Sequence, residues 1–215
     1  GEAGVQIVTG DTKVVERGKG DGVFINTAGV GRVLPGVTVS GDLARPGDSV
    51  IVSGTLGDHG VAIMSQRTGL QFATALDSDS ASLNGLVKAM TGVGGEAIRV
   101  LRDPTRGGLA ATLNEIAAQS GVGIALKEAA IPLRQEVKGA CELLGLDPLN
   151  VANEGKLIAI VEAASAGPIL SAMKRHPLGR DAAIVGTVTD DAMQLVRMVT
   201  HIGGERVIDW LHGEQ

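Results

Sequence analysis

Aromatic residues are almost absent from this chain, whose 215 residues include two Phe, one Trp and no Tyr. Because aromatic rings normally supply a large part of the buried area of a core, this core must be built from Val, Leu, Ile, Ala and a few Met. The sequence also contains 32 glycines, which stand in short groups between the apolar runs. We therefore expect many tight turns and close backbone approaches between aliphatic elements.

Composition restricts the partners that the chain can have. It is 44% hydrophobic and 20% charged, which is ordinary for a globular protein of one or two domains. A net charge of −5 without a long basic run argues against nucleic acid and against an anionic membrane surface. No stretch approaches ~18 uninterrupted apolar residues, so no membrane span is expected.

Cys141 is the single cysteine. It excludes an intramolecular disulfide and a multi-cysteine metal site, and one cysteine suits a reducing compartment such as the cytoplasm. The residue lies in KGACELLG, within an apparent helix, where nothing nearby in the sequence would activate a thiolate. We therefore expect Cys141 to be buried and structural.

Residues 1–42 hold too few elements to make a domain. Strands are expected at residues 5–9, 13–15 and 23–28. The turn RPGD, residues 45–48, then precedes a further strand. We expect a domain boundary near Asp42, with residues 1–42 as the remnant of a larger N-terminal domain and residues 43–215 as a C-terminal domain.

Helices and strands mix along residues 43–215, which indicates an α+β fold. Periodicity predicts helices at 56–68, 82–91, 107–119, 133–144 and 165–176. Strands are expected at 49–53, 97–101, 123–127, 156–161, 182–188 and 194–199, the last two paired with each other. Gly145 is expected to end the fourth helix.

The motif GDTKVV, residues 10–15, places a carboxylate and an ammonium group at the end of a predicted strand. Asp11 offers the hard oxygen ligand that Mg²⁺ prefers, and Lys13 offers a point charge for a phosphate. A solvated turn with an incidental salt bridge explains the same residues, and the local sequence alone favours that simpler interpretation.

The motif LGDHG, residues 56–60, lies between a predicted strand and a predicted helix. Strand-to-helix loops often bind ligands, and amides at a helix N-terminus attract anions. Asp58 can orient His59 or cap the helix. His59 is either a functional base or a locally bonded surface histidine.

The motif RDPTRGGL, residues 102–109, also precedes a helix. Arg106 can fork onto phosphate oxygens, and Gly107 and Gly108 let a ligand approach the backbone amides. The motif lacks the ending of a Walker loop. A plain helix start capped by Asp103 or Thr105 is the alternative.

The motif ANEGKL, residues 152–157, stands directly before an apolar strand. A carboxylate at the mouth of a strand, here Glu154, can act as a base or a metal ligand. Asn153 and Gly155 alone would also make a turn. The motifs together form a series of Gly-framed acids, bases and cations at element ends, which favours a phosphate-handling enzyme.

The motifs GDTKVV, FINTAGVG, SGTLGDHG, RDPTRGGL, LNEIA, CELLGLDPL and NEGKL occur here in this order. In this set the chain closely resembles the HypE family of hydrogenase maturation factors, also called carbamoyl dehydratases. That family belongs to the superfamily of aminoimidazole ribonucleotide synthetase and selenophosphate synthetase. The resemblance covers about Gly4 to Gln215, nearly the whole chain.

The resemblance implies a C-terminal domain like that of aminoimidazole ribonucleotide synthetase, preceded by the last strands of the N-terminal domain. It implies a homodimer built on N-domain strands, one of which matches residues 24–31. It also implies [NiFe] hydrogenase maturation. HypF loads a carbamoyl group onto the family's C-terminal cysteine, ATP with Mg²⁺ drives its dehydration to a thiocyanate, and the cyanide passes to iron on the HypC–HypD complex.

The same resemblance implies roles for residues of this chain. Lys13 and Arg106, with Gly107 and Gly108, would hold phosphates, and Asp11 would help to hold Mg²⁺. Glu154 and His59 are the available bases for removing protons from the carbamoyl nitrogen. We expect Glu154 to come first, because a strand mouth can limit its solvation and raise its pKa.

Two features of the family are missing from this sequence. The family's N-terminal domain starts well before Gly1, and its cysteine-bearing tail lies just beyond the position of Gln215. We therefore expect this polypeptide alone to be inactive. The alternatives are another ATP-dependent synthetase of the superfamily, of the selenophosphate or aminoimidazole ribonucleotide type, and a non-catalytic domain that docks partners.

Overall fold

The computed structural model describes residues 1–20, 22–68 and 76–209. Its strands are β1 (Ser49–Val52), β2 (Ile98–Arg102), β3 (Gly123–Lys127), β4 (Ile158–Val161), β5 (Ala183–Thr189), β6 (Val196–Val199) and β7 (Glu205–Val207). Its α-helices are α1 (Asp58–Thr68), α2 (Asn84–Gly94), α3 (Gly108–Ser120), α4 (Gln135–Leu144) and α5 (Ala163–Lys174). Single 3₁₀ turns cover Gly95–Ala97, Glu128–Ala130, Pro148–Asn150 and Pro177–Gly179.

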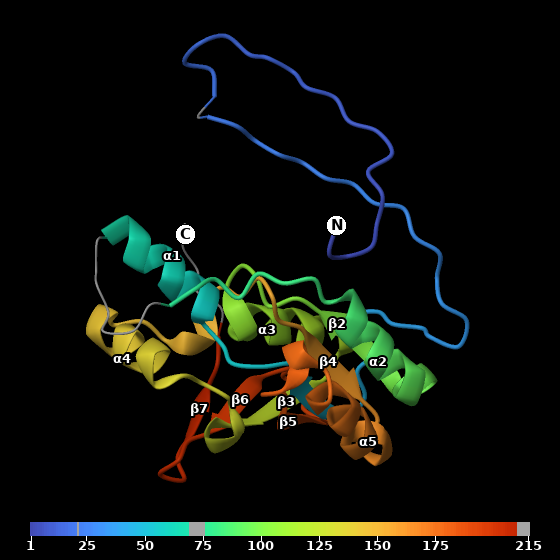
Figure 1. Cartoon of the computed structure of the whole chain (residues 1–215). Helices are drawn as coiled ribbons and strands as arrows, with labels where there is room; N and C mark the ends of the chain where they lie inside the picture. Colours follow the sequence, from blue (N-terminus) through green and yellow to red (C-terminus); the bar gives the residue numbers. More distant parts are fainter. Residues whose placement is uncertain (21, 69–75, 210–215) are drawn as a thin grey trace.

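The described strands form one mixed sheet in the order β2-β4-β1-β5-β3-β6-β7 (Figure 1). β1 lies near its centre and pairs antiparallel with both β4 and β5. All four residues of β4 are buried, as expected of a short aliphatic run covered on both faces. The register places Val52 opposite Ile158, so the end of β1 and the start of β4 lie at the same edge of the sheet.

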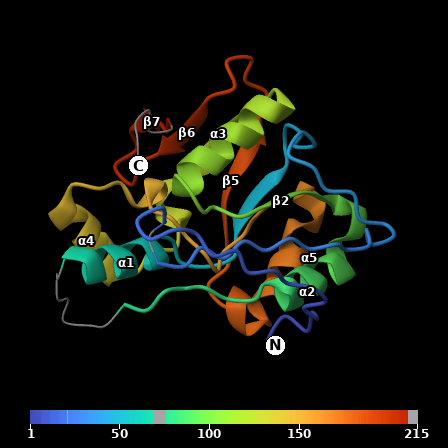
Figure 2. The same ribbon diagram turned by 90° about the horizontal axis from the view of Figure 1, so that it is seen from above.

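Successive residues of β1 contribute to different cores, because side chains alternate across a strand. Val50 and Val52 join the apolar cluster that includes α3. Ile51 joins the cluster on the other face, with residues of α2 and α5. The sheet therefore has helices on both faces, and Figure 2 shows α2 and α5 together at one end of the molecule.

The helices α1 and α4 lie side by side at the opposite end, as Figures 1 and 2 both show. A smaller cluster of Val61, Val137, Ala140, Cys141 and Val151 joins them. Gly145 follows α4 with φ +67°, and its amide donates to the carbonyl of Cys141. The predicted helix end at Gly145 and the predicted burial of Cys141 are confirmed.

The predicted pairing of the strands at 182–188 and 194–199 is wrong. β3 lies between β5 and β6, antiparallel to the first and parallel to the second. The connection between β5 and β6 passes the start of β3, where a Cβ on Gly123 would lie 2.5 Å from the Cβ of Asp191. A glycine there makes room for the crossing. The short strand β7 was not predicted from the sequence.

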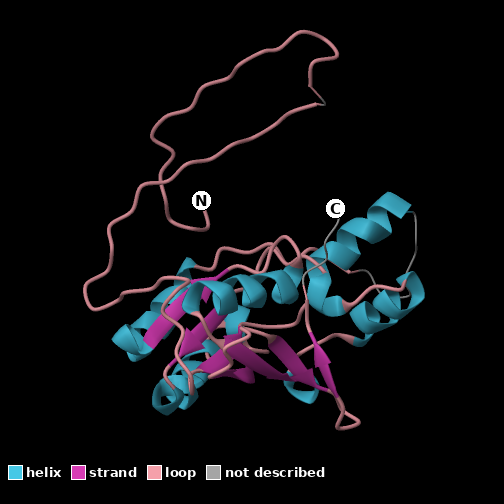
Figure 3. Ribbon diagram, turned by 180° about the vertical axis from the view of Figure 1, so that it is seen from behind, coloured by secondary structure: helices cyan, strands magenta, loops and turns pink. Residues whose placement is uncertain are grey.

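The predicted strands at 5–9, 13–15 and 23–28 are absent from the structure. In the described part of residues 1–48, the chain forms neither helix nor strand, and it loops away from the sheet (Figures 1 and 3). A strand needs a paired neighbour for its backbone groups, and no described strand lies beside this segment. Contact with the domain resumes at Ser40, whose amide donates to the carbonyl of Arg99, and Ala44 is buried. The domain boundary near Asp42 stays a prediction.

The described helices are all too short or too polar to cross a membrane.

Candidate functional site

Two loops meet where β1 ends and β4 begins. The amide of Ser53 donates to the carbonyl of Leu157, and the Oγ of Ser53 accepts from the amide of Leu157 at 2.9 Å. These bonds extend the β1–β4 pairing past the strand ends. They bring LGDHG and ANEGKL together, although about 95 residues separate the two motifs in the sequence.

Asn153 connects three of the predicted motifs. Its side chain is fully buried, and its Oδ1 accepts from the amide of Gly57 at 2.8 Å. Its Nδ2 donates to the carbonyls of Pro104 and Val151 at 3.1 and 3.0 Å. The loops of LGDHG, RDPTRGGL and ANEGKL are therefore held against one another through one amide group, which does more than form the turn expected of it.

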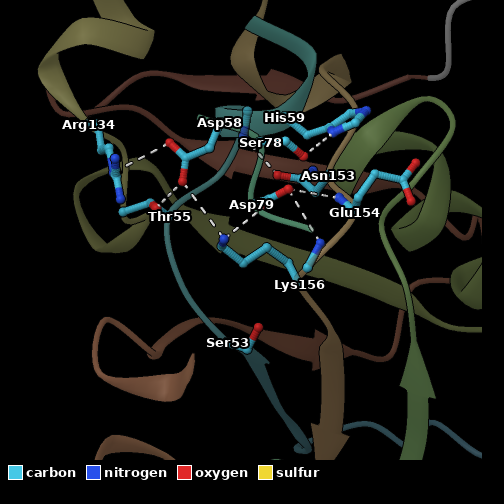
Figure 4. Close-up of polar contacts among 12 residues, drawn as sticks. Ser53, Thr55, Asp58, His59, Ser78, Asp79, Arg134, Asn153, Glu154 and Lys156 are labelled. Carbon is cyan, nitrogen blue, oxygen red and sulfur yellow. Dashed lines mark hydrogen bonds and ion pairs between the residues drawn. The ribbon is translucent and has the colours of Figure 1, made fainter. Parts of the chain in front are cut away.

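Lys156 lies between two buried carboxylates at this junction (Figure 4). Its Nζ is 2.9 Å from Asp79 Oδ2 and 3.8 Å from Asp58 Oδ2. The same Oδ2 of Asp58 accepts from Thr55 Oγ1, and its Oδ1 is 3.5 Å from Arg134 Nε. Buried charges need such pairing, because isolated ions are costly away from water.

Asp79 also binds the backbone of the ANEGKL loop. Its Oδ1 accepts from the amides of Glu154 and Gly155 at 3.0 and 3.3 Å. A Cβ on Gly155 would collide with the carbonyl oxygen of Asp79. The segment around Asp79 therefore packs tightly on this loop, and glycine is required at position 155.

His59 bonds the same segment from the other side. Its Nδ1 is 2.7 Å from Ser78 Oγ, and Ser78 Oγ also donates to Ser80 Oγ. With the hydroxyl proton on the bond to Ser80, Ser78 accepts from Nδ1–H, and this tautomer leaves Nε2 with a lone pair. In this tautomer Nε2 is the ring nitrogen that can accept a proton, and the role of His59 as a base stays a prediction. Asp58 does not orient it, since its contacts are with Thr55 and the two cations.

Glu154 presents its carboxylate to solvent. Its backbone amide is fixed by Asp79, but its side chain is exposed and points away from Asp58 and Lys156 (Figure 4). The limited solvation expected at the strand mouth is therefore not observed. What the structure does fix is the backbone from which this side chain extends.

A polar cavity of about 340 Å³ opens beside these residues. Its lining includes Thr55, Asp58, Asp79, Arg134, Lys156 and Arg180. Acidic and cationic groups are both present, and the Lys156 ammonium group is already paired with the carboxylates of Asp58 and Asp79. The cavity suits a polar ligand with charges of both signs.

A family model described as AIR synthase related protein, C-terminal domain, matches residues 45–198. The chain belongs to this family. The carbamoyl dehydratase HypE of Rhizobium leguminosarum bv. viciae is 61% identical over 214 residues, which are 100% of this chain and 61% of that protein. The chain thus spans less than two thirds of the length of this curated relative.

Solved structures agree with the family assignment. A crystal structure of a HypE–HypF complex is 49% identical, with a TM-score of 0.79 over 82% of this chain and 57% of that chain. A crystal structure of HypE in complex with ATP is 48% identical, with a TM-score of 0.76 over 81% of this chain and 53% of that chain. The α+β fold, with its mixed sheet, is the fold of the C-terminal domain in this family.

The two glycines of RDPTRGGL have a structural explanation in this AIR synthase related domain. Gly107 and Gly108 have φ of +69° and +61°, which few other residues adopt. A Cβ on Gly108 would also lie 2.5 Å from the carbonyl oxygen of Leu149. Gly107 is the N-cap of α3, with no side-chain cap bond, so neither Asp103 nor Thr105 caps the helix. Arg106 is exposed beside them.

Asp11 and Lys13 lie apart from the cavity. Both are exposed on the N-terminal segment that loops away from the sheet (Figure 1). Asp11 Oδ1 accepts from the amide of Thr12, its own neighbour. Within residues 1–20, 22–68 and 76–209, no three His, Cys, Asp or Glu side chains are grouped to hold a metal. The predicted Mg²⁺ site is therefore not assembled by these residues.

Asp79, Arg134 and the central position of Lys156 were not predicted from the sequence. Lys156 is in the quoted NEGKL motif, and its position before a buried strand was an available signal. Asp79 and Arg134 stand in segments without a Gly-framed motif. Only the tertiary contacts show that they belong to the site.

Proposed function

We propose that this chain is part of an ATP-dependent carbamoyl dehydratase of [NiFe] hydrogenase maturation, which converts a cysteine-bound carbamoyl group to a thiocyanate. The observation that carries the proposal is the likeness to a protein named carbamoyl dehydratase HypE along the whole chain. The site supports it, because Ser78 and Asp79 line the polar cavity. Ser78 contacts the ring of the predicted base His59, and Asp79 binds the backbone amide of the predicted base Glu154.

The chemistry needs one phosphoryl transfer and two deprotonations. The carbamoyl oxygen attacks the γ-phosphorus of ATP, ADP leaves, and the nitrogen loses its first proton. Loss of the second proton then breaks the C–O bond, releases phosphate and leaves a C≡N group on sulfur. Phosphorylation is required because an amide oxygen is a poor leaving group. Two protons require acceptors, and the Glu154 carboxylate with Nε2 of His59 can supply them.

The remaining site assignments belong to the same proposal. Lys13 and Arg106 would bind phosphate oxygens, with Gly107 and Gly108 close to the phosphates. Mg²⁺ would neutralise phosphate charge with Asp11 as a ligand, and no step above depends on it. Asp11 and Lys13 would have to approach the cavity from the N-terminal segment.

The proposed partners follow from the likeness to HypE. HypF would donate the carbamoyl group, and a HypE–HypF complex is among the similar structures. ATP binding is proposed from a HypE structure in complex with ATP. We also propose a homodimer, a HypC–HypD complex as cyanide acceptor, and a cytoplasmic location.

The test uses the complete natural protein, with any residues that precede Gly1 or follow Gln215. Incubation with ATP and carbamoyl-loaded HypF should yield a thiocyanate on cysteine, detected by mass spectrometry of the tryptic peptide. Glu154→Gln should lower the rate about 10²- to 10⁴-fold, the usual contribution of a positioned base, with ATP affinity retained. The exposed Asp190→Ala should leave the rate unchanged.

Two results would count against this function. A wild-type protein that consumes ATP but forms no thiocyanate is not a carbamoyl dehydratase. Formation of selenophosphate or aminoimidazole ribonucleotide instead would assign another synthetase of the superfamily. Full activity in Glu154→Gln would leave the function standing and remove Glu154 as the base.

A further inference from the structure

Asp79 is a buried carboxylate that binds the backbone of a candidate site loop as well as a side chain. Its side chain is 5% exposed. One carboxylate oxygen accepts two successive amides, those of Glu154 and Gly155, and the other meets Lys156 Nζ at 2.9 Å. A carboxylate with three such donors is held in one orientation.

The loop that Asp79 binds is fixed at each of its four residues. Asn153 is anchored by its buried amide, and Lys156 by the two carboxylates. Gly155 lies against the carbonyl oxygen of Asp79. Glu154 is held only through its backbone amide, while its side chain extends into solvent. Its position therefore depends on the bond to Asp79.

The same segment reaches the second candidate base. Ser78, the residue before Asp79, contacts Nδ1 of His59. Lys156 connects Asp79 to Asp58, the residue before His59. Glu154 and His59 are thus both bound by residues 78 and 79, although they come from loops far apart in the sequence.

We propose that Asp79 is a positioning residue, whose carboxylate holds the backbone of Glu154 so that the Glu154 side chain can reach the carbamoyl nitrogen. This inference rests on the proposed function. Asp79 does not touch the substrate in this role. It acts through geometry, and a misplacement of about 1 Å in a reacting group can cost roughly 10²-fold in rate.

The experiment measures kcat and KM for ATP in the complete natural protein, with thiocyanate as the product. Asp79→Ala removes the acceptor of both amides, and we expect kcat to fall roughly 10- to 100-fold, while KM for ATP stays within about twofold, as for a lost transition-state interaction. Asp79→Asn keeps an oxygen that can accept both amides. Its NH₂ group cannot accept from the Lys156 ammonium, which keeps Asp58 as its partner. This variant should recover kcat to within about fivefold of wild type.

A merely structural role gives a different result. Both variants would then lose thermal stability, while the rate per folded molecule stayed at the wild-type level, and this outcome would overturn the proposal. An unchanged kcat in Asp79→Ala, or an asparagine variant as slow as the alanine variant, would also overturn it. Should Asp79→Ala fail to fold, Asp79→Glu replaces it: it keeps the charge but moves the carboxylate, so a low kcat is expected and a wild-type kcat contradicts us.

The controls separate this inference from the function on which it rests. Asp190→Ala removes a carboxylate in the exposed β5–β6 connection and should leave kcat unchanged. A wild-type protein without thiocyanate formation overturns the function and the inference together. An active wild-type protein, a slow Glu154→Gln and a normal Asp79→Ala overturn the inference alone.

Discussion

Some single residues at this site have a structural role that their residue type does not predict. Asn153 reads as a turn residue in the sequence, yet its buried side chain binds backbone groups of two other loops. A buried amide of this kind is tolerated only because its groups are satisfied. These hydrogen bonds hold the LGDHG and RDPTRGGL loops at a fixed distance from each other. The sequence alone does not predict that the two loops are close.

Gly108 allows a prediction about packing at the start of α3. Gly108→Ala places a Cβ 2.5 Å from the carbonyl oxygen of Leu149 at a φ of +61°. We expect unfolding free energy to fall by about 2–4 kcal/mol, from strain and overpacking together, measured by urea denaturation. Gly92→Ala is the matched control, because its Cβ would meet nothing within 4 Å inside α2. It should stabilise the protein by about 0.5–1 kcal/mol. Equal effects in the two variants would contradict this account of Gly108.

Cys141 allows a prediction about pH. Burial, and secondarily the negative charge of Asp147, raises the pKa of its thiol above the ordinary value of 9.0. The unfolded thiol therefore ionises first as the pH rises, and the unfolded state then binds fewer protons than the folded state. Stability should be complete below the ordinary thiol pKa and should fall above it, by at most about 1.4 kcal/mol per pH unit.

Cys141→Ala provides the comparison for this pH dependence. The packing contacts that it loses do not depend on pH, and the variant has no thiol to titrate at this position. The difference in unfolding free energy between wild type and variant should therefore shrink from pH 8 to pH 10. A constant difference across this range would show that burial does not hold the thiol protonated.

At the scale of elements, helices and strands were predicted well from the sequence where the local pattern of apolar residues determines the structure. Apolar periodicity located α1 to α5 within a few residues, because each helix buries one face, as α3 does with Leu109, Leu113 and Ile116. The all-apolar β4 was recognisable as a buried strand for the same reason. These patterns depend on neighbours in the chain and need no partner to be identified.

Prediction failed where an element depends on its neighbours in space. The short β5–β6 connection suggested a hairpin, but β3 enters between these strands. Strands were also expected at 5–9 and 23–28, where no described strand is available to pair. The candidate site shows the same limit, since Glu154 and His59 were found from motifs, whereas Asp79 was found only from its contacts.

At the scale of the whole molecule, the site exists only because distant segments converge at one edge of the sheet. LGDHG, the segment around Asp79, RDPTRGGL and ANEGKL are spread over about 100 residues. The β1–β4 register brings the first and last together, and Asn153 and Asp79 attach the others. The N-terminal segment that carries Lys13 takes no part in this arrangement (Figures 1 and 3).

This separation predicts the result of a truncation. The N-terminal segment is first attached firmly to the domain at Ser40, which bonds Arg99, and at Gly41, which bonds Ser120. Before this point, the carbonyl of Ala3 accepts one exposed hydrogen bond from Asn84. A chain that starts at Ser40 should therefore unfold cooperatively with a Tm within about 3 °C of the 215-residue chain, since lost surface contacts amount to about 0.5–1 kcal/mol. Circular dichroism melting measures it.

The matched control is a chain that starts at Ser49. It removes the buried Ala44 and Asp48, and Asp48 pairs with Arg99 at 3.0 Å while its carbonyl accepts from the amide of Val188. Losing it leaves Arg99 without its more buried partner and Val188 without an acceptor, so we expect Tm to fall by about 6–12 °C, from roughly 3 kcal/mol of lost stability. A segment that contributes nothing to the core should not be needed for cooperative unfolding. Loss of cooperative unfolding in the chain that starts at Ser40 would therefore show that residues 1–39 belong to the folded unit.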